Sequence, residues 1–148
     1  MRPSLPARRR MRGATIVEFA VVGSTFLLLL IGAMELGRML FYWNSAVEAT
    51  RLGARVAAVC DVNATAIKTK VQSMLPILNT GDIDVTYTPS GCTVNNCYYV
   101  TVAIHSGTVV QNFIPFVSLN LTLPAMSTTL PRESMLSTVN GTANPICN

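Results

Sequence analysis

The sequence predicts an α+β fold in which one long N-terminal helix packs on a small antiparallel sheet. Two patterns lead to this prediction. In the first half, an apolar run passes into an amphipathic helical pattern, and no proline interrupts the chain from Pro6 to Pro76. In the second half, short segments alternate apolar and polar residues between turn residues. A length of 148 residues suffices for one domain and an N-terminal segment.

The composition is unusually apolar, and the charge is concentrated at the N-terminus. Half of the residues are hydrophobic and 12% are charged, which is a lower charge content than in an ordinary soluble domain. The net charge of +4 comes from the first twelve positions, which hold five of the eleven basic residues. Six basic residues against seven acidic ones remain, so we expect no nucleic-acid partner, since that needs a basic face.

The N-terminus has the features of a membrane segment. The 16 residues from Phe19 to Met34 carry no charge but are short for a span of about 20 residues. A span from Ala14 is long enough but includes Glu18, and a carboxylate in lipid is costly without a partner or a function. Alternatively, Glu18 lies solvated at the membrane edge. The preceding arginines predict a cytoplasmic N-terminus and a translocated C-terminus.

The helical pattern continues beyond Glu35 with apolar residues at spacings near three and four. These residues are Leu36, Met39, Leu40, Trp43, Val47, Ala54 and Ala57. We therefore predict one helix from Ala14 to about Cys60, roughly 70 Å long. Its amphipathic outer half requires packing partners. Tyr42 and Trp43 either cover the protein's own sheet or mark the outer membrane boundary, where such rings concentrate.

The residues after Cys60 predict a small α+β domain. Residues 64–75 have helical spacing and end before Pro76. Residues 82–88 and 97–105 are predicted to form an antiparallel hairpin. A third strand is expected over 119–130, with Pro124 at an edge or a bend. We expect residues 108–117 to cross over the sheet, and residues 137–148 to be loose apart from Cys147.

The four cysteines all follow the apolar segment, which favours disulfides in an oxidising compartment. Three connectivities are possible, and we favour Cys92 with Cys97 and Cys60 with Cys147. The first would fix the shape of a tight loop, and the second would tie the C-terminus to the end of the long helix. A metal site is the weaker alternative, because C-x4-C with a single histidine has poor ligand spacing. Cys60 as a buried free thiol also stays open.

Enzymatic motifs are missing from the sequence. It contains no paired-histidine motif, nucleophile elbow or P-loop. His105 is interpreted as a structural histidine at a strand end. Asp82 and Asp84 are expected on one face of a strand, where two carboxylates make an incomplete calcium shell. We therefore predict no catalytic residue, no metal and no cofactor.

Three segments of the helix together resemble one known family. Residues 12–20, 35–38 and 48–55 are similar to TadE-like pseudopilins of tight-adherence (Flp/Tad) secretion systems. The third segment contains the helix motif Glu48, Arg51, Gly53 and Arg55. Residues 126–133 are similar to that family's last strand, more loosely. The resemblance is strong over residues 8–58 and covers only the element order between 60 and 120.

The resemblance implies a pilin-like fold and a minor pilin-like role in a Tad type IV pilus. A prepilin peptidase would cut between Gly13 and Ala14, which makes Glu18 the fifth mature residue. In pilins this carboxylate is thought to neutralise the N-terminal amine of a neighbouring subunit. Implied partners are other pilin-like subunits, Tad inner-membrane assembly proteins, the peptidase and membrane lipid.

The expected organisation has four parts in the inner membrane and periplasm. Residues 1–13 form a basic leader, 14–36 the transmembrane half of the helix, 37–61 its extracytoplasmic half, and 62–148 a periplasmic domain. Two other hypotheses remain, a membrane-anchored extracytoplasmic ligand-binding protein and a secreted protein. A mature N-terminus at Ala14 favours the pilin-like role. A start at Met1 or Arg2 favours the anchored protein, and a start near Met34 the secreted one.

Overall fold

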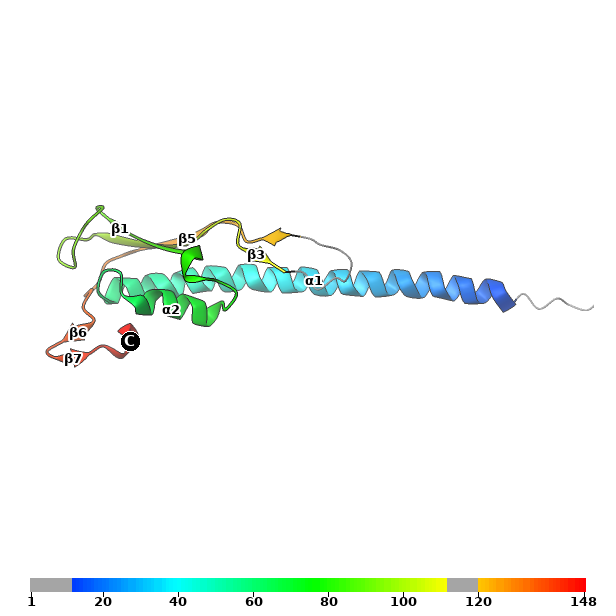
Figure 1. Ribbon diagram of the computed structural model, residues 1–148, viewed down its shortest axis with the longest axis horizontal. Helices are drawn as coiled ribbons and strands as arrows, with labels where there is room; N and C mark the ends of the chain where they lie inside the picture. The colour runs from blue at the N-terminus through cyan, green and yellow to red at the C-terminus, as the bar shows by residue number, and fades with distance from the viewer. Residues whose placement is uncertain (1–11, 112–119) are drawn as a thin grey trace, which may run out of the picture.

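A computed structural model describes residues 12–111 and 120–148 of the chain. Its main element is helix α1, Arg12–Val59, with 48 residues and a length of about 72 Å. The small domain covers only the C-terminal half of α1, and the N-terminal half projects from it as a single rod (Figure 1). The predicted continuous helix and the α+β fold class are confirmed.

The C-terminal end of α1 is set by tertiary contacts rather than by a glycine or a proline. The carbonyl of Ala58 accepts the N–H of Glu133 at 2.9 Å, and the carbonyl of Val59 accepts the N–H of Leu136 at 2.8 Å. The hydroxyl of Ser134 also donates to Val59 at 3.2 Å. These donors satisfy carbonyls that a helix end leaves unpaired.

Three strands form the main antiparallel sheet in the order β1-β2-β5, with bounds Ile83–Thr88, Tyr99–Ile104 and Met126–Pro131. The predicted hairpin is therefore present as β1 and β2. Cross-strand register places three rows toward the helices, all apolar except for Thr128: Ile83, Ile104 and Met126; Val85, Val102 and Thr128; Tyr87, Val100 and Leu130. The residues between them, such as Thr86, Thr101 and Thr129, line the outer face.

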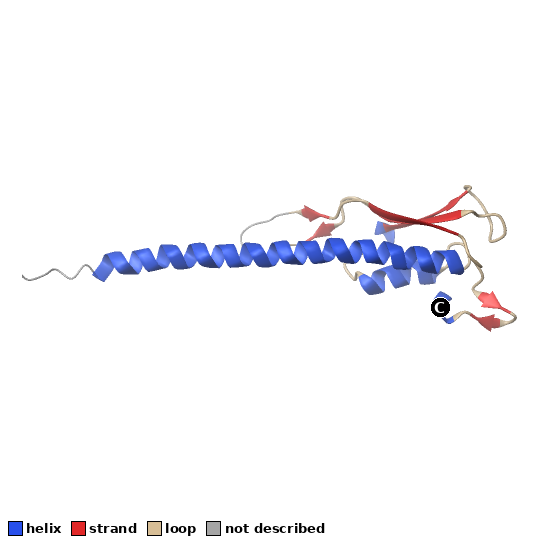
Figure 2. Ribbon diagram, turned by 180° about the vertical axis from the view of Figure 1, so that it is seen from behind, coloured by secondary structure: helices blue, strands red, loops and turns tan. Residues whose placement is uncertain are grey.

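Helix α2, Thr65–Met74, lies beside α1 and completes a helical layer under the sheet (Figures 1 and 2). It buries Ala66, Ile67 and Val71, which follow the predicted helical spacing. The core between the two layers includes Ile67, Val71, Ile83, Val102 and Ile104. The resulting domain is one helical layer and one sheet, with α1 extending beyond both.

The remaining elements are short. Strands β3 (Val109–Val110) and β4 (Leu121–Thr122) form one ribbon, and β6 (Thr138–Val139) and β7 (Thr142–Ala143) form another. The 3-10 turns are η1 (Thr80–Asp82) and η2 (Pro145–Cys147).

Two sequence predictions are corrected here, and a third falls largely outside the described residues. The strand expected over 119–130 is divided, because β4 pairs with β3 while β5 joins the main sheet; Leu119 lies outside the described residues. The segment expected to cross the sheet begins with β3, and its residues 112–117 also lie outside the described part. The tail is not loose, because Asn140 and Gly141 adopt positive φ values of 49° and 79° and close the β6-β7 hairpin.

The two aspartates expected on one strand face have separate roles. Asp82 lies in η1, where its carboxylate accepts the N–H of Asn79 at 2.8 Å. Asp84 lies on β1, where its carboxylate is 2.6 Å from Nε2 of His105, with both side chains about half exposed. No cluster of three possible metal ligands occurs among the described residues. The aspartates therefore do not share a surface.

Candidate interaction surface of the N-terminal helix

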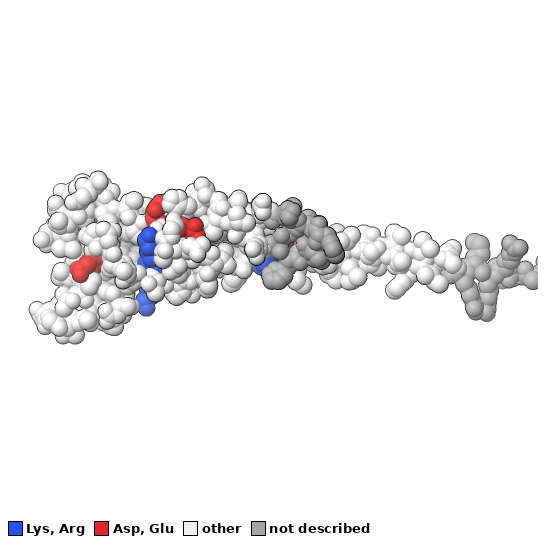
Figure 3. All heavy atoms as spheres, in the orientation of Figure 1, with Lys and Arg blue, Asp and Glu red and all other residues white. Residues whose placement is uncertain are grey.

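The N-terminal half of α1 presents a long apolar surface to its surroundings. From Gly13 to Met34 every residue is exposed except Gly23, which is half-buried. Phe19 is 78% exposed and Met34 74%. On the face shown in Figure 3, the visible charged atoms gather over the domain-bearing half. Within the described residues, α1 is the one helix long and apolar enough to cross a membrane.

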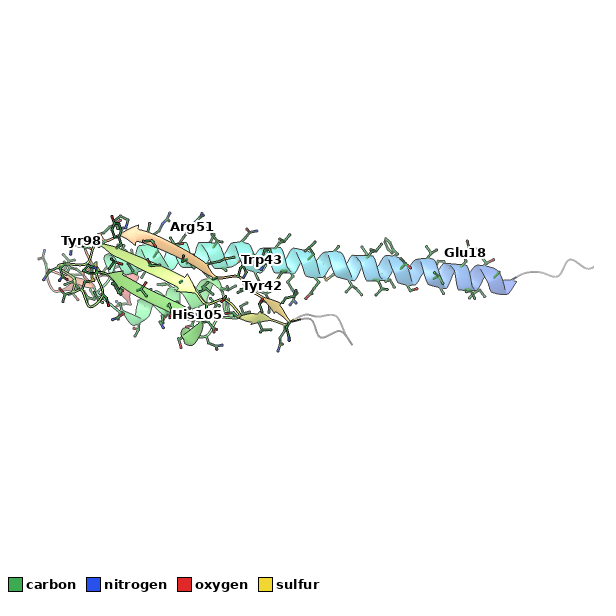
Figure 4. All side chains as sticks on the ribbon, turned by 90° about the horizontal axis from the view of Figure 1, so that it is seen from above. Glu18, Tyr42, Trp43, Arg51, Tyr98 and His105 are labelled. Carbon is green, nitrogen blue, oxygen red and sulfur yellow. A yellow bond between two sulfur atoms is a disulfide. The ribbon has the colours of Figure 1, made fainter. Side chains whose placement is uncertain are left out.

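The predicted processing and assembly residues lie on this exposed half. Gly13, Ala14 and Glu18 are all helical and exposed. Ala14 and Glu18 are four residues apart, so they share one face about 6 Å apart along the axis. Figure 4 shows Glu18 near the free end of α1, far from the domain. No described residue forms an ion pair with Glu18.

The helix motif of residues 48–55 divides between two faces of α1. Gly53 is buried where α1 meets α2 and β2: an added Cβ would lie 2.5 Å from Val71 Cγ2 and 3.1 Å from Val102 Cγ1. Glu48 and Arg51 form an exposed ion pair of 2.7 Å. Arg55 is exposed as well. Gly53 therefore serves the packing of the domain, whereas the charged residues face outward.

Sequence reasoning did not single out Thr50, which links α1 to β5. Thr50 is 1% exposed, and its hydroxyl lies 2.9 Å from the hydroxyl of Thr128. It also donates to the carbonyl of Val47 at 2.8 Å. The available indication was that Thr50 lies four residues after Ala46 and three before Gly53, so the three share one face of a helix.

The boundary between the exposed and covered halves of α1 holds a second ion pair. Glu35 is 8% exposed, and its carboxylate accepts from Arg38 at 2.5 Å. The Arg38 guanidinium also donates to the carbonyl of Gln111 and lies 5.8 Å from the ring centre of Tyr42. This cluster holds the end of β3 against α1.

A groove of about 540 Å³ opens beside this cluster, between α1 and β4. Trp43 lines it together with Leu36, Met39 and Leu121. Met39 and Tyr42 pack on the core, so they cover the protein's own domain, whereas Trp43 is 39% exposed. Of the two interpretations of the aromatic pair, the structure thus supports coverage for Tyr42.

The two disulfides are present in the pairing that the sequence favoured. Cys60 at the end of α1 is bonded to Cys147, with a Cα–Cα distance of 5.5 Å. Cys92 is bonded to Cys97 in the loop of the hairpin, with a Cα–Cα distance of 5.1 Å. Within this loop the carbonyl of Val94 accepts from the Arg132 guanidinium. The described residues contain no free cysteine.

Tyr87 joins the main core to the small cluster around the hairpin disulfide. It packs against the main core and against the cluster of Cys92, Cys97 and Met135. Burial raises the pKa of Tyr87 above its usual value of 10.0, and the hydrogen bond that its oxygen accepts from the Asn63 N–H acts in the opposite direction. Its neutral form is therefore favoured in the folded domain.

Comparison with known families matches the N-terminal helix. The family described as TadE-like protein matches residues 13–55, which begin at the predicted cleavage glycine and end at Arg55. No curated protein and no solved structure matches the chain. The match includes the exposed apolar half, Glu18 and the motif of residues 48–55. The N-terminal helix of this chain is thus similar to the TadE-like family, as the resemblance of its three sequence patterns predicted.

Proposed function

We propose that this chain is a minor pilin-like component of a Tad type IV pilus system. In this proposal a prepilin peptidase removes residues 1–13, residues 14–36 remain in the inner membrane, and residues 37–148 lie in the periplasm. Its role is structural: the N-terminal helix packs with other pilin-like subunits and with Tad inner-membrane proteins.

One observation carries the proposal: the TadE-like segment is a helix whose apolar half no part of the described domain covers. A surface of this size requires lipid or other apolar helices around it. The outer half of the same helix is fixed in the domain through Thr50, Gly53 and the Cys60–Cys147 disulfide. The chain is therefore built to hold a folded domain on an apolar rod.

Glu18 has a defined chemical role in this arrangement. Cleavage after Gly13 would create an amine at Ala14, one turn from Glu18 on the same face. An isolated carboxylate in lipid is costly, and an opposite charge offsets much of that cost. We infer that Glu18 pairs with the amine of a neighbouring subunit, which favours one alignment of the helices.

The mature N-terminus tests the proposed processing directly. The full chain is expressed in cells with and without an active prepilin peptidase, and its first residue is determined by sequencing or mass spectrometry. We expect Ala14 with the peptidase and the intact leader without it. A start at Met1 or Arg2 in both strains would favour a simple membrane anchor, and a start near Met34 a secreted protein; either result would overturn the proposal.

The role of Glu18 is tested by Glu18→Ala. This variant is expected to insert into the membrane with normal topology, because removing a charge from a span does not oppose insertion. Pilus assembly should fall strongly, measured as surface pili per cell. Ser24→Ala is the matched control, because the Ser24 hydroxyl donates only to carbonyls of its own helix, at 2.6 and 3.1 Å. Normal piliation with Glu18→Ala would contradict the role.

A further inference from the structure

The face of α1 opposite its own domain forms one continuous exposed seam. The domain covers the face that includes Met39, Ala46, Ala49, Gly53 and Ala57, all buried. The opposite face follows steps of four and three residues along almost the whole helix, with two successive steps of four at Ala33, Gly37 and Phe41. Its members are Phe19, Gly23, Phe26, Leu30, Ala33, Gly37, Phe41, Asn44, Glu48, Arg51 and Arg55.

The outer end of this seam is exposed and charged. The side chains of Arg51 and Glu48 are 57% and 54% exposed, and Arg51 projects outward from α1 (Figure 4). An exposed pair of this kind stabilises a helix by only about 0.3–0.5 kcal/mol. Its hydrogen bond uses Glu48 Oε1, and a carboxylate can accept a second cation on its other oxygen. No ion pair within the described residues involves Arg55.

We propose that this seam packs against the same seam of a second copy of the chain, parallel and displaced by seven residues. The proposal rests on the proposed function, since a shared membrane topology makes the two helices parallel. Seven residues are two turns, or about 10 Å along the axis, and this displacement brings seam residues opposite seam residues at every level except Ala33, which meets Leu40 beside the seam.

Charge complementarity selects this displacement. Two copies in register would place Glu48, Arg51 and Arg55 opposite their own counterparts, which is unfavourable for like charges. A displacement of seven residues brings Glu48 of one copy to the level of Arg55 of the other. It also places Asn44 opposite Arg51, so that an amide oxygen faces a guanidinium.

Side-chain size agrees with the same displacement at three levels of the apolar half, whereas Phe19 falls opposite Phe26. Seven residues bring Leu30 opposite Gly37 and Phe26 opposite Ala33. They also bring Gly23 opposite Leu30, so that a large side chain meets a small one at each of these levels. An added Cβ at Gly23 or Gly37 would meet nothing within 4 Å in the isolated chain, so the space beside them is open. Small residues allow apolar helices to approach closely in a membrane.

Such a contact is heterologous, since one copy uses residue n and the other residue n+7. Each copy keeps one unused half of the seam, so the contact repeats along a line of subunits instead of closing into a symmetric dimer. The seam therefore identifies the partner as a second copy and sets its axial position.

Crosslinking in membranes tests the displacement. The double variant Asn44→Cys/Arg51→Cys of the full chain is expressed with its secretion system, and the membranes are mildly oxidised. We expect a ladder of oligomers on a non-reducing gel, because residue 44 of each copy meets residue 51 of the next. Either single variant should give no ladder. Leu36→Cys/Trp43→Cys is the matched control, since it has the same seven-residue separation and both residues are exposed off the seam.

A charge exchange tests the ion pair in the same assay. Glu48→Arg and Arg55→Glu, each introduced into the Asn44→Cys/Arg51→Cys background, should each reduce the ladder several-fold. The combined Glu48→Arg/Arg55→Glu exchange should restore it. This rescue cannot arise within one helix, because residues 48 and 55 are two turns apart and Arg51, the partner of Glu48 in its own chain, is replaced in this background. Lys70→Glu on α2 is the control charge reversal and should leave the ladder unchanged.

Strong dimers from the single cysteine variants would indicate copies in register and overturn the proposal. Crosslinks only to a protein of another mass, or no crosslinks at all, would also overturn it. The mature N-terminus and surface pili are measured in the same cells. A chain that starts at Ala14 and supports pili without forming the ladder refutes the seam alone, whereas an uncut chain refutes the proposed function.

Discussion

At the scale of single residues, Gly53 is the one of the nine glycines where an added Cβ would overlap other side chains. The backbone of α1 approaches both α2 and β2 at this glycine, and the buried side chains of Val71 and Val102 occupy the space where a Cβ would lie. Valine has little freedom to change its rotamer in a packed site. The close approach of three elements therefore depends on the absence of one carbon atom.

Gly53→Ala is expected to destabilise the domain by about 1–3 kcal/mol. The better helix propensity of alanine, about 1 kcal/mol, opposes this loss but does not cancel the overlap. The measurement is denaturant unfolding of the detergent-solubilised chain. The double variant Gly53→Ala/Val71→Ala should lose less than the sum of the two single losses, because Val71→Ala removes the overlapping Cγ2. Gly37→Ala, where an added Cβ meets nothing within 4 Å, should be neutral or stabilising; a larger loss there would contradict the explanation.

Tyr87 gives the domain a dependence on alkaline pH. Burial raises its pKa in the folded state, so folding favours the protonated phenol. This contribution is complete below the unfolded value of 10.0 and is lost as pH rises through the higher folded pKa. We expect stability to decrease with pH above about 10. Titration of unfolding free energy checks this, and Tyr87→Phe should reduce the slope; an unchanged slope would assign it to other groups.

At the scale of elements, the sequence predicts the regular segments well and their junctions poorly. The α1 helix, α2 and the β1-β2 hairpin follow local periodicity, so the sequence alone is sufficient to derive them. The end of α1 is different, because its carbonyls are satisfied by Glu133 and Leu136, far along the chain. Pro124 indicates a break in the third strand, but not that its two parts join different sheets. The Asn140-Gly141 dipeptide is a strong hairpin signal, so the β6-β7 turn could have been predicted from the sequence.

The candidate site was predictable to a similar degree. Glu18 and Gly13 were identified by their sequence context, and the structure leaves Glu18 exposed on the uncovered half of α1. The function of Gly53 in packing was not predictable, because Val71 and Val102 approach it from other elements. Separating the motif into a packing residue and outward charges required knowledge of which face the domain covers.

The two disulfides should differ in their effect on stability. Cys60 and Cys147 are 87 residues apart, and Cys92 and Cys97 are 5 apart. Loop-closure entropy assigns about 4–5 kcal/mol to the long connection and about 2 kcal/mol to the short one. Replacing each pair with serines and measuring thermal unfolding should therefore show a larger loss for Cys60→Ser/Cys147→Ser. Equal losses would mean that the long loop is already restricted in the unfolded chain.

At the scale of the whole molecule, helix α1 has one apolar half that stands outside the domain and one half that belongs to an ordinary core. Residues 13–34 are exposed almost without exception, whereas burial of α1 begins at Glu35. The two halves therefore require different surroundings, and the change takes place within one helix. The domain does not need the apolar half for its own core, since every buried α1 residue lies at or beyond Glu35.

A chain that begins at Met34 should accordingly be soluble without detergent. We expect it to form both disulfides and to unfold in one transition, because its core residues are all retained. Circular dichroism, thiol quantification and size-exclusion chromatography provide the measurements, with the full chain in detergent for comparison. Aggregation of the shortened chain with unpaired thiols would show that the apolar half contributes to folding.

The bond between Cys60 and Cys147 has a mechanical consequence. The disulfide closes residues 60–147 into a covalent ring, which is joined to the end of α1 through Cys60. Once the contacts between the sheet and α1 have broken, a force that pulls on a point of this ring is divided between its two arms and reaches the helix through the covalent link at Cys60. A pulling force can open the sheet, but the ring then extends by at most about half the length that the same residues would span as an unclosed chain.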